Sequence, residues 1–285
     1  MEQAKFGCYA SSMSLQTANA RPPPTSPAHV GEHLREWRQR RHLSQLDLAV
    51  DAEISARHLS FVETGRAAPS RDMVLRLAER LDVPLRERNV LLVAAGFAPA
   101  FSQRSLDDPA LKSARAAIDL VLKAHEPNPA IAVDRHWNLV SANRMVTPLL
   151  DGIPERLLGQ PFNVLRLCFH PEGLAARTVN LAEWCAHLLE RLHRQCEATA
   201  DPALIRLYQD LKAFPIPARA TPLSSDSVAI PFKLRHDGDV LSFFSTTMVF
   251  GTPVDITLSE LALETFFPAD ELTAERMRRM AASLK

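Results

Sequence analysis

A short stretch around Arg57 carries side chains that can contact the edges of DNA bases. In a helix, Ala56, Arg57, Ser60 and Phe61 would lie on one outward face, because positions three and four apart are neighbours there. Arginine can bind guanine through two hydrogen bonds, and an apolar side chain can contact the methyl group of thymine. The spacing predicts a recognition surface for the major groove of DNA. Burial in a helical bundle is the alternative for Phe61.

Other polar side chains nearby can hold the DNA backbone. Gln45 would lie in the first turn of a helix, where it can donate to a phosphate or to a base edge. Arg66 and Arg71 would clamp phosphates, unless they are ordinary solvated arginines. Ser44 and Ser55 are placed to cap the two helices that carry these groups, and we include both in the expected DNA-binding surface.

Two short helices joined by a tight turn must position these side chains. The first begins at Gln45 and the second at Ala56, and Ala49 is small enough for the two axes to approach. Glu53 falls in the turn, where a left-handed backbone is expected and a residue other than glycine costs about 1 kcal/mol. The apolar residues of the expected shared interior are Leu48, Ala52, Ile54, Leu59 and Val62.

The surrounding residues distinguish this pattern from an ordinary helical hairpin. Leu34 and Trp37 precede the two helices, and Val74, Leu77 and Leu81 follow them, all at helical spacing. These additional apolar faces complete a compact bundle, for which five short helices fit between the breaks in the sequence. We therefore expect an all-α, five-helix domain.

The stretch from about Val30 to Ala95 resembles the Xre (phage-repressor-like) helix-turn-helix family. The resemblance is carried by Ser44-Gln45, Leu48-Ala49, Ile54-Ser55, Leu59-Ser60, Glu63-Thr64-Gly65-Arg66 and Pro69-Ser70. It implies sequence-specific binding to double-stranded operator DNA. The formal net charge of the chain is zero, with 33 Lys and Arg against 33 Asp and Glu, which excludes a binder that works by bulk charge. We therefore expect a homodimer that binds two half-sites.

The chain after Pro109 changes character and predicts an α+β domain with an antiparallel sheet. The pair Asp237-Gly238 is typical of a hairpin turn, since both central positions need positive φ. The expected strands are Ala130–Asp134, Trp137–Ala142, Val228–Arg235, Val240–Phe250 and Ile256–Glu264. The expected helices are Leu111–His125, Leu181–Ala198 and Ala203–Phe214, of which the first would couple the two domains. Helices lying across a curved sheet can enclose a ligand cavity.

Several segments of this domain resemble the MmyB-like ligand-binding domain, a PAS-like module, namely 114–144, 161–174, 180–192 and 239–270. The resemblance implies a small hydrophobic ligand, with a fatty acid as the leading suggestion. Candidate lining residues, each of which could instead be plain core, are Trp137, Leu149, Phe162, Leu165, Trp184, Leu188, Phe243, Met248 and Phe250. Asn143 and Arg144 could hold a ligand carboxylate, with helix capping and simple exposure as their alternatives. A ligand-free dimerisation or protein-interaction platform is the alternative for the whole domain.

The expected organisation is therefore multidomain. Residues 1–28, which end near the run RPPPTSP, are expected to be a disordered tail. Residues 29–101 form the repressor-like helix-turn-helix domain, and residues 109–285 form the PAS-like domain for ligand binding and dimerisation, after a polar joint. Both Met1 and Met13 stay open as the start of the chain.

Enzyme, metal and membrane functions find no support in the sequence. There is no G-x-S-x-G motif, and 9 glycines are too few for a phosphate-binding loop to be expected, so we expect no catalytic residue and no cofactor. Cys185 and Cys196 lie three helical turns apart, too far to share one ion, and we expect no metal. No apolar run reaches the roughly 18–20 residues of a membrane span, and we expect a cytoplasmic protein.

Overall fold

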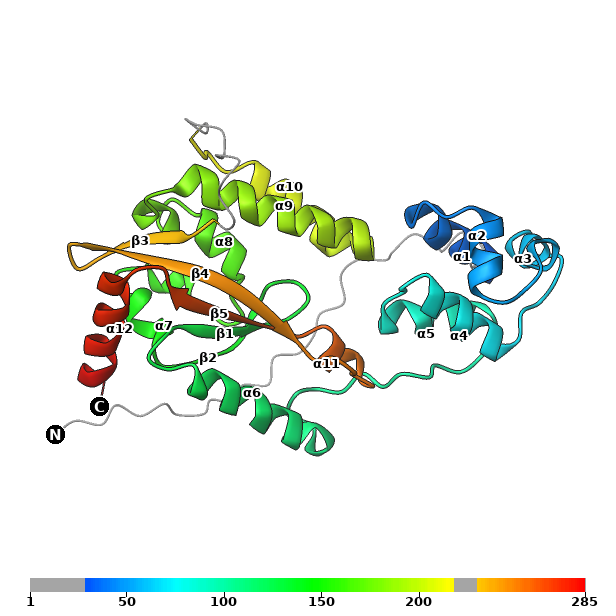
Figure 1. The fold of residues 1–285 in the computed structure, drawn as a ribbon, viewed down its shortest axis with the longest axis horizontal. Coiled ribbons are helices and arrows are strands. Elements are labelled where there is room, and N and C mark those ends of the chain that lie inside the picture. The colour runs from blue at the N-terminus through cyan, green and yellow to red at the C-terminus, as the bar shows by residue number, and fades with distance from the viewer. Residues whose placement is uncertain (1–28, 218–229, 285) are drawn as a thin grey trace, which may run out of the picture.

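The computed structural model describes residues 29–217 and 230–284, which form a helical N-terminal part and a sheet-containing C-terminal part (Figure 1). The expected disordered tail over residues 1–28 lies outside the described residues, as does the start of the expected strand Val228–Arg235. Within these ranges the predicted fold class is confirmed: a five-helix domain is followed by an α+β domain with an antiparallel sheet.

The five helices of the N-terminal part are α1 (Val30–Arg40), α2 (Gln45–Asp51), α3 (Ala56–Glu63), α4 (Arg71–Arg80) and α5 (Leu85–Ala94). Serine caps determine where three of them begin. The hydroxyl of Ser44 accepts the backbone N–H of Asp47, whose carboxylate accepts the backbone N–H of Ser44 in return. The hydroxyls of Ser55 and Ser70 cap α3 and α4 by accepting the backbone N–H groups of His58 and Met73. The predicted helix starts at Gln45 and Ala56 are confirmed.

The turn between α2 and α3 has the left-handed residue that the sequence predicts. Glu53 has φ 55°, and the backbone N–H of Ile54 donates to the carbonyl of Ala49 at 2.9 Å. The turn therefore tolerates a glutamate where glycine would be free of strain.

The interior of the helical domain consists of apolar side chains from every helix, all aliphatic except that of Trp37. Leu48, Ala49, Ala52, Leu59 and Val62 are buried, as expected for the two central helices. Helices α1 and α3 approach so closely that a Cβ on Gly31 would lie 2.1 Å from the carbonyl oxygen of Val62. The backbone contact therefore requires glycine at this point in α1.

The C-terminal part alternates helices and strands. Its helices are α6 (Lys112–Ala124), α7 (Val146–Leu149), α8 (Val164–Phe169), α9 (Leu181–Thr199), α10 (Pro202–Lys212), α11 (Ile256–Ser259) and α12 (Glu271–Ser283). Three short 3-10 helices are η1 (Pro109–Leu111), η2 (Glu155–Leu157) and η3 (Leu174–Arg177). Its strands are β1 (Ala130–Val133), β2 (Leu139–Ala142), β3 (Phe232–His236), β4 (Asp239–Val249) and β5 (Ala262–Pro268).

The strands form one antiparallel sheet in the order β2-β1-β5-β4-β3. The hairpin between β3 and β4 turns at Asp237 and Gly238, both at positive φ as predicted. Helices α8, α9 and α10 pack on one face of the sheet, which contributes Ile131, Val133 and Phe243 to the main core. Helix α6 packs on the opposite face, against Ala130 and Ala132 (Figure 1).

The expected strand Ile256–Glu264 is wrong in its first half. Residues Ile256–Ser259 form the helix α11, and β5 begins only at Ala262. The cause is local, because the carboxylate of Asp255 accepts the backbone N–H of Thr257 and so starts a helical turn. Arg104 holds this carboxylate at 3.1 Å.

The close approach at Gly31 yields a prediction about stability. We expect Gly31→Ala to lower the free energy of unfolding by about 1–3 kcal/mol, since the added methyl group would force α1 away from α3. Differential scanning calorimetry of the full chain measures the change. Gly159→Ala is the matched control, because a Cβ there meets no atom within 4 Å. A Gly31→Ala variant as stable as the control would contradict the prediction.

Candidate DNA-binding surface and ligand pocket

The expected recognition face of α3 is open to solvent. Arg57 is exposed, and Ala56, Ser60 and Phe61 are half-buried. The guanidinium carbon of Arg57 lies 5.4 Å from the ring centre of Phe61, one helical turn away. Helix α3 packs against α1 and α2 through its other side. The face thus presents an arginine stacked on an aromatic ring, a geometry that limits the conformations of the guanidinium.

The remaining residues of the expected DNA-binding surface surround α3. Ser44 and Ser55 are exposed, and their hydroxyl oxygens accept the hydrogen bonds that cap α2 and α3. Arg66 and Arg71 are exposed, after the end of α3 and at the start of α4. Gln45 is half-buried, and its amide donates to the carboxylate of Glu63 at 2.7 Å. This hydrogen bond uses one of the two amide N–H donors that the sequence assigned to DNA.

A buried ion pair fixes the end of α3, and sequence reasoning gave it no role. Arg38 donates from Nε and Nη2 to the two carboxylate oxygens of Glu63, at 2.7 and 2.9 Å, and from Nη1 to the carbonyl of Leu43 at 2.9 Å. Donation to the Glu63 carboxylate raises the pKa of Arg38, and the negative charge of that carboxylate adds to this effect. The pair joins α1 to α3. The hydrogen bond from Gln45 to Glu63 joins the start of α2 to the same carboxylate. The sequence signal for this ion pair is Glu63, a charged residue beside the apolar residues Leu59 and Val62 at the end of α3.

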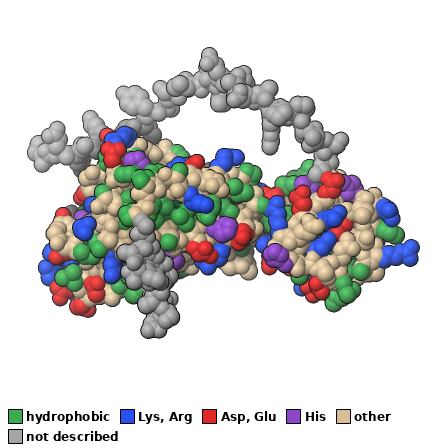
Figure 2. Space-filling model, turned by 90° about the horizontal axis from the view of Figure 1, so that it is seen from above, with side chains coloured by type: hydrophobic (Ala, Val, Ile, Leu, Met, Phe, Trp, Pro, Cys, Tyr) green, Lys and Arg blue, Asp and Glu red, His purple; other side chains and the backbone are tan. Residues whose placement is uncertain are grey.

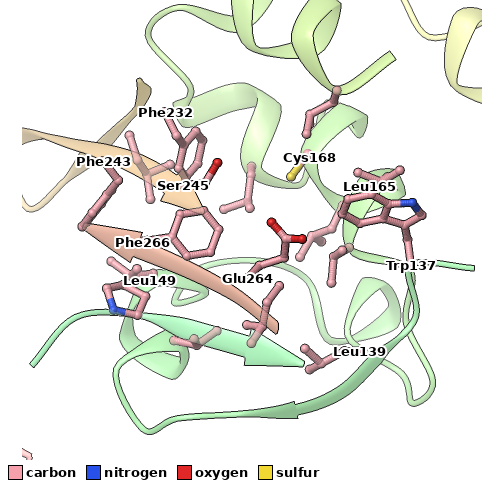
Figure 3. Close-up of a pocket in the computed structure, with 18 of the residues that line it drawn as sticks. Trp137, Leu139, Leu149, Leu165, Cys168, Phe232, Phe243, Ser245, Glu264 and Phe266 are labelled. Carbon is pink, nitrogen blue, oxygen red and sulfur yellow. The ribbon is translucent and has the colours of Figure 1, made fainter. Parts of the chain in front are cut away.

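The C-terminal domain holds an apolar pocket between the sheet and α7, α8 and α9 (Figure 3). The centre of a water-sized sphere can occupy about 110 Å³ of this pocket, which is partly open to solvent. Predicted residues that line it are Trp137, Leu149, Phe162, Leu165, Trp184, Leu188 and Phe243. The helical spacing brings Trp184, Leu188 and Arg191 to one side of α9, and the strand alternation brings Phe243 and Ser245 to one face of β4.

Four of the residues predicted to bind the ligand lie outside this pocket, namely Met248, Phe250, Asn143 and Arg144. Met248 is 41% exposed, because its odd spacing from Phe243 places it on the opposite face of β4. Phe250 packs with Ile118 and Leu122 in the cluster under α6. Neither side chain can therefore contribute to the pocket in this arrangement.

The expected carboxylate clamp is also displaced from the pocket. Asn143 is buried, and its amide joins backbone groups: it donates to the carbonyls of Leu122 and Asn128 and accepts the N–H of Ala130. Arg144 is exposed and pairs with Glu126 at 2.8 Å. Asn143 is thus a structural cross-link at the sheet edge, and Arg144 lies on the outer surface.

The charged residues in the pocket wall are Arg191 and Glu264, which sequence reasoning missed. The Glu264 side chain is 4% exposed and accepts from Arg191 Nη1 at 2.9 Å and from Nη2 at 2.5 Å. The Arg191 guanidinium carbon lies 4.6 Å from the ring centre of Trp137. The signal in the sequence is the alternation Ala262, Glu264, Phe266 along β5, which places a carboxylate on an otherwise apolar face.

The two domains meet at a charged junction, where blue, red and purple side chains gather in Figure 2. Arg86 of α5 donates from Nε and Nη2 to the carboxylate of Glu260, both at 2.8 Å. This hydrogen bonding raises the pKa of Arg86. Arg135 lies 3.4 Å from both Glu260 and Asp201, and Arg41 donates to the carbonyl of Ala198 at 3.4 Å. The helical domain is therefore held by α9, α11 and the loop after β1.

Neither a metal site nor a membrane span is found in the described ranges. No cluster of three or more His, Cys, Asp and Glu side chains within them could hold a metal ion. None of their helices is both long and apolar enough to cross a membrane.

A capped helix-turn-helix followed by a sheet domain with an apolar pocket defines a DNA-binding transcription regulator with a ligand-binding domain. Residues 29–91 match the family described as a helix-turn-helix domain, and residues 114–280 match the MmyB-like transcription regulator ligand binding domain. The second match covers more than half of the chain, so the protein belongs to the family of MmyB-like regulators. Both resemblances expected from the sequence are confirmed, and these are families of transcription regulators rather than enzymes.

Comparisons with individual proteins add little. No curated protein matches the chain. Among solved structures, the chain is similar to the crystal structure of the clp gene regulator ClgR from Corynebacterium glutamicum, with 23% identity over 37% of this chain and 99% of that chain. The TM-score of 0.22 is too low for this likeness to bear on fold or function.

The pocket yields a prediction about Cys168, whose thiol is in its wall. Burial raises the pKa of this thiol from 9.0 to about 12, so the thiolate population at pH 8 falls by roughly three orders of magnitude. We expect iodoacetamide to alkylate Cys168 at least a hundredfold more slowly in the native protein than in urea, as measured by peptide mass spectrometry. The native rate should still rise with pH at pH 10. A rate that levels off near pH 9 would contradict the prediction.

Proposed function

We propose that this protein binds operator DNA as a homodimer and that its DNA affinity changes when a small hydrophobic ligand fills the pocket. The ligand class that fits is an acyl-chain compound, such as a fatty acid or a neutral derivative of one. The observation that carries the proposal is the apolar pocket lined by the same helix, α9, that contacts the DNA-binding domain. Such a regulator of the bacterial type would act in the cytoplasm, where the DNA is.

The recognition face supports the DNA-binding half of the proposal. Arg57 and Phe61 stand on the open side of a short helix, and Arg66 and Arg71 extend the exposed surface at its end. In this arrangement Arg57 reads guanine and the two other arginines hold phosphates. Two copies of the surface, one from each protomer, would bind two half-sites of the operator.

Helix α9 supports the coupling half of the proposal. Its first half lines the pocket with Trp184 and Leu188, and its last turn accepts Arg41 of the helical domain at the carbonyl of Ala198. Between these points Gln195 accepts the indole N–H of Trp137 at 2.8 Å and donates to the carbonyl of Arg135 at 3.0 Å. A ligand that moves Trp137 would therefore change the junction.

The helix Leu111–His125, which the sequence assigned to coupling between the domains, does not line the pocket. It corresponds to α6, which covers the opposite face of the sheet from the pocket. We therefore propose α9 for the role that the sequence assigned to α6. The ligand would shift the protein between states of different DNA affinity by changing the position of the two helical domains in the dimer.

The recognition face yields a prediction about specificity. We expect Arg57→Ala to reduce the preference for an operator over a scrambled duplex by tenfold or more, because a bidentate contact discriminates by about 1–3 kcal/mol. The operator is first selected from random DNA with the wild-type protein, and both affinities are measured by fluorescence anisotropy. Arg80→Ala, at the exposed end of α4, is the matched control and should keep the wild-type ratio. An unchanged ratio in Arg57→Ala would contradict the assignment.

The pocket yields a prediction about bound molecules. We expect organic extraction of the purified protein, followed by mass spectrometry, to release a stoichiometric acyl compound. Leu188→Trp should lose it, because the indole would fill the pocket, whereas Ala186→Trp adds the same group on the exposed side of α9 and should retain it. Protein that carries no such compound, and binds none of a series of acyl compounds, would favour the dimerisation or interaction platform instead.

A further inference from the structure

The ion pair between Arg191 and Glu264 lies in the wall of an otherwise apolar pocket and carries no net charge. The carboxylate of Glu264 points into the space bordered by Trp137 and Leu165, and the remaining side chains labelled around it are mostly apolar (Figure 3). Arg191 supplies two hydrogen bonds to this carboxylate, and the hydroxyl of Thr247 supplies a further one at 3.1 Å. One positive and one negative charge therefore cancel at the place where a ligand head group would lie.

The neighbouring groups do not alter this balance. His187 stacks on Trp184, and burial lowers its pKa, with the nearby charges of Arg191 and Arg194 acting in the same direction. His187 is therefore neutral at pH 7.5 and adds no positive charge. Ser245 and Cys168, the other polar groups of the wall, are neutral as well, since burial raises the pKa of the Cys168 thiol.

A charged ligand head would disturb the pair. A carboxylate would place a second negative charge beside Glu264, in a site where apolar walls screen charges poorly, and like charges disfavour each other's ionised forms. An ammonium group would meet the same difficulty beside Arg191. A hydroxyl or a primary amide adds no charge, and it can donate a hydrogen bond to a remaining lone pair of Glu264.

We propose that the pocket selects acyl-chain or alkyl-chain compounds with a neutral, hydrogen-bond-donating head group, such as an alcohol or a primary amide, over the corresponding carboxylates. Arg191 and Glu264 set this specificity together. The inference rests on the proposed function, since it names the head group of a ligand in the same pocket.

The test uses one chain length and four head groups. Wild-type protein, freed of bound lipid on a hydrophobic resin, is titrated at pH 7.5 with 1-decanol, decanamide, decanoic acid and decylamine by isothermal titration calorimetry. We expect 1-decanol and decanamide to bind at least tenfold more tightly than decanoic acid or decylamine. In Glu264→Gln, which keeps the shape of the side chain, Arg191 is left unpaired, and the affinity for decanoic acid relative to 1-decanol should rise at least tenfold.

A second variant keeps the test decisive if Glu264→Gln does not fold. Arg191→Met leaves Glu264 unpaired, and the preference should then move toward decylamine by a similar factor. Thermal unfolding reports whether each variant is folded. The ratios between the affinities of the wild type for the four compounds test the inference without either variant.

The outcomes separate this inference from the proposed function. Binding of all four compounds, with decanoic acid equal to or tighter than 1-decanol in the wild type, overturns the head-group inference and leaves the ligand pocket in place. An unchanged ratio of decanoic acid to 1-decanol in folded Glu264→Gln overturns it as well. No binding of any compound to the wild type overturns the proposed function itself.

Discussion

Helix α9 must bury one side against the sheet, and the arrangement of the C-terminal domain depends on that burial. The helix has 19 residues and is therefore about 28 Å long. Trp184, Cys185, Leu188 and Leu192 on its inner side join the core with β3 and β4. The covering is incomplete near Leu188, where the side chains leave the apolar pocket, and the last turn extends to the DNA-binding domain. One helix thus links the apolar pocket to the helical domain that contains α3.

Two ion pairs with buried carboxylates give each domain a defined geometry. Arg38 and Glu63 join helices that are distant in sequence, and Arg191 and Glu264 join α9 to β5. Removing one partner of such a pair costs about 3–5 kcal/mol, because the other charge stays buried without compensation. The two pairs nevertheless differ in surroundings. The first lies within a packed bundle, whereas the second borders an open pocket, so that its charge balance also determines what the pocket can accept.

Local sequence rules predicted much of this fold, and they failed where a local signal was overlooked or where distant contacts decide. The capping serines gave the starts of α2 and α3, and Asp237-Gly238 gave the hairpin, because each signal acts within a few residues. Residues 256–259, Ile-Thr-Leu-Ser, alternate apolar and polar side chains as a strand does, which hid the cap at Asp255. Among the pocket residues, large apolar side chains were found by type, whereas Met248 was misplaced because the alternation of faces along β4, which separates it from Phe243, was not applied. Glu264 was missed because its partner is on a helix 73 positions away.

The central claim is that occupancy of the pocket changes the affinity of the protein for DNA, and one titration tests it directly. The dissociation constant for the selected operator is measured by anisotropy with the protein freed of lipid, and again after the pocket is saturated with the compound that co-purifies with the protein. Coupling between two sites in regulators is typically 5–150-fold, so the account predicts at least a fivefold difference between the two constants. Equal dissociation constants for the empty and the saturated protein would contradict it.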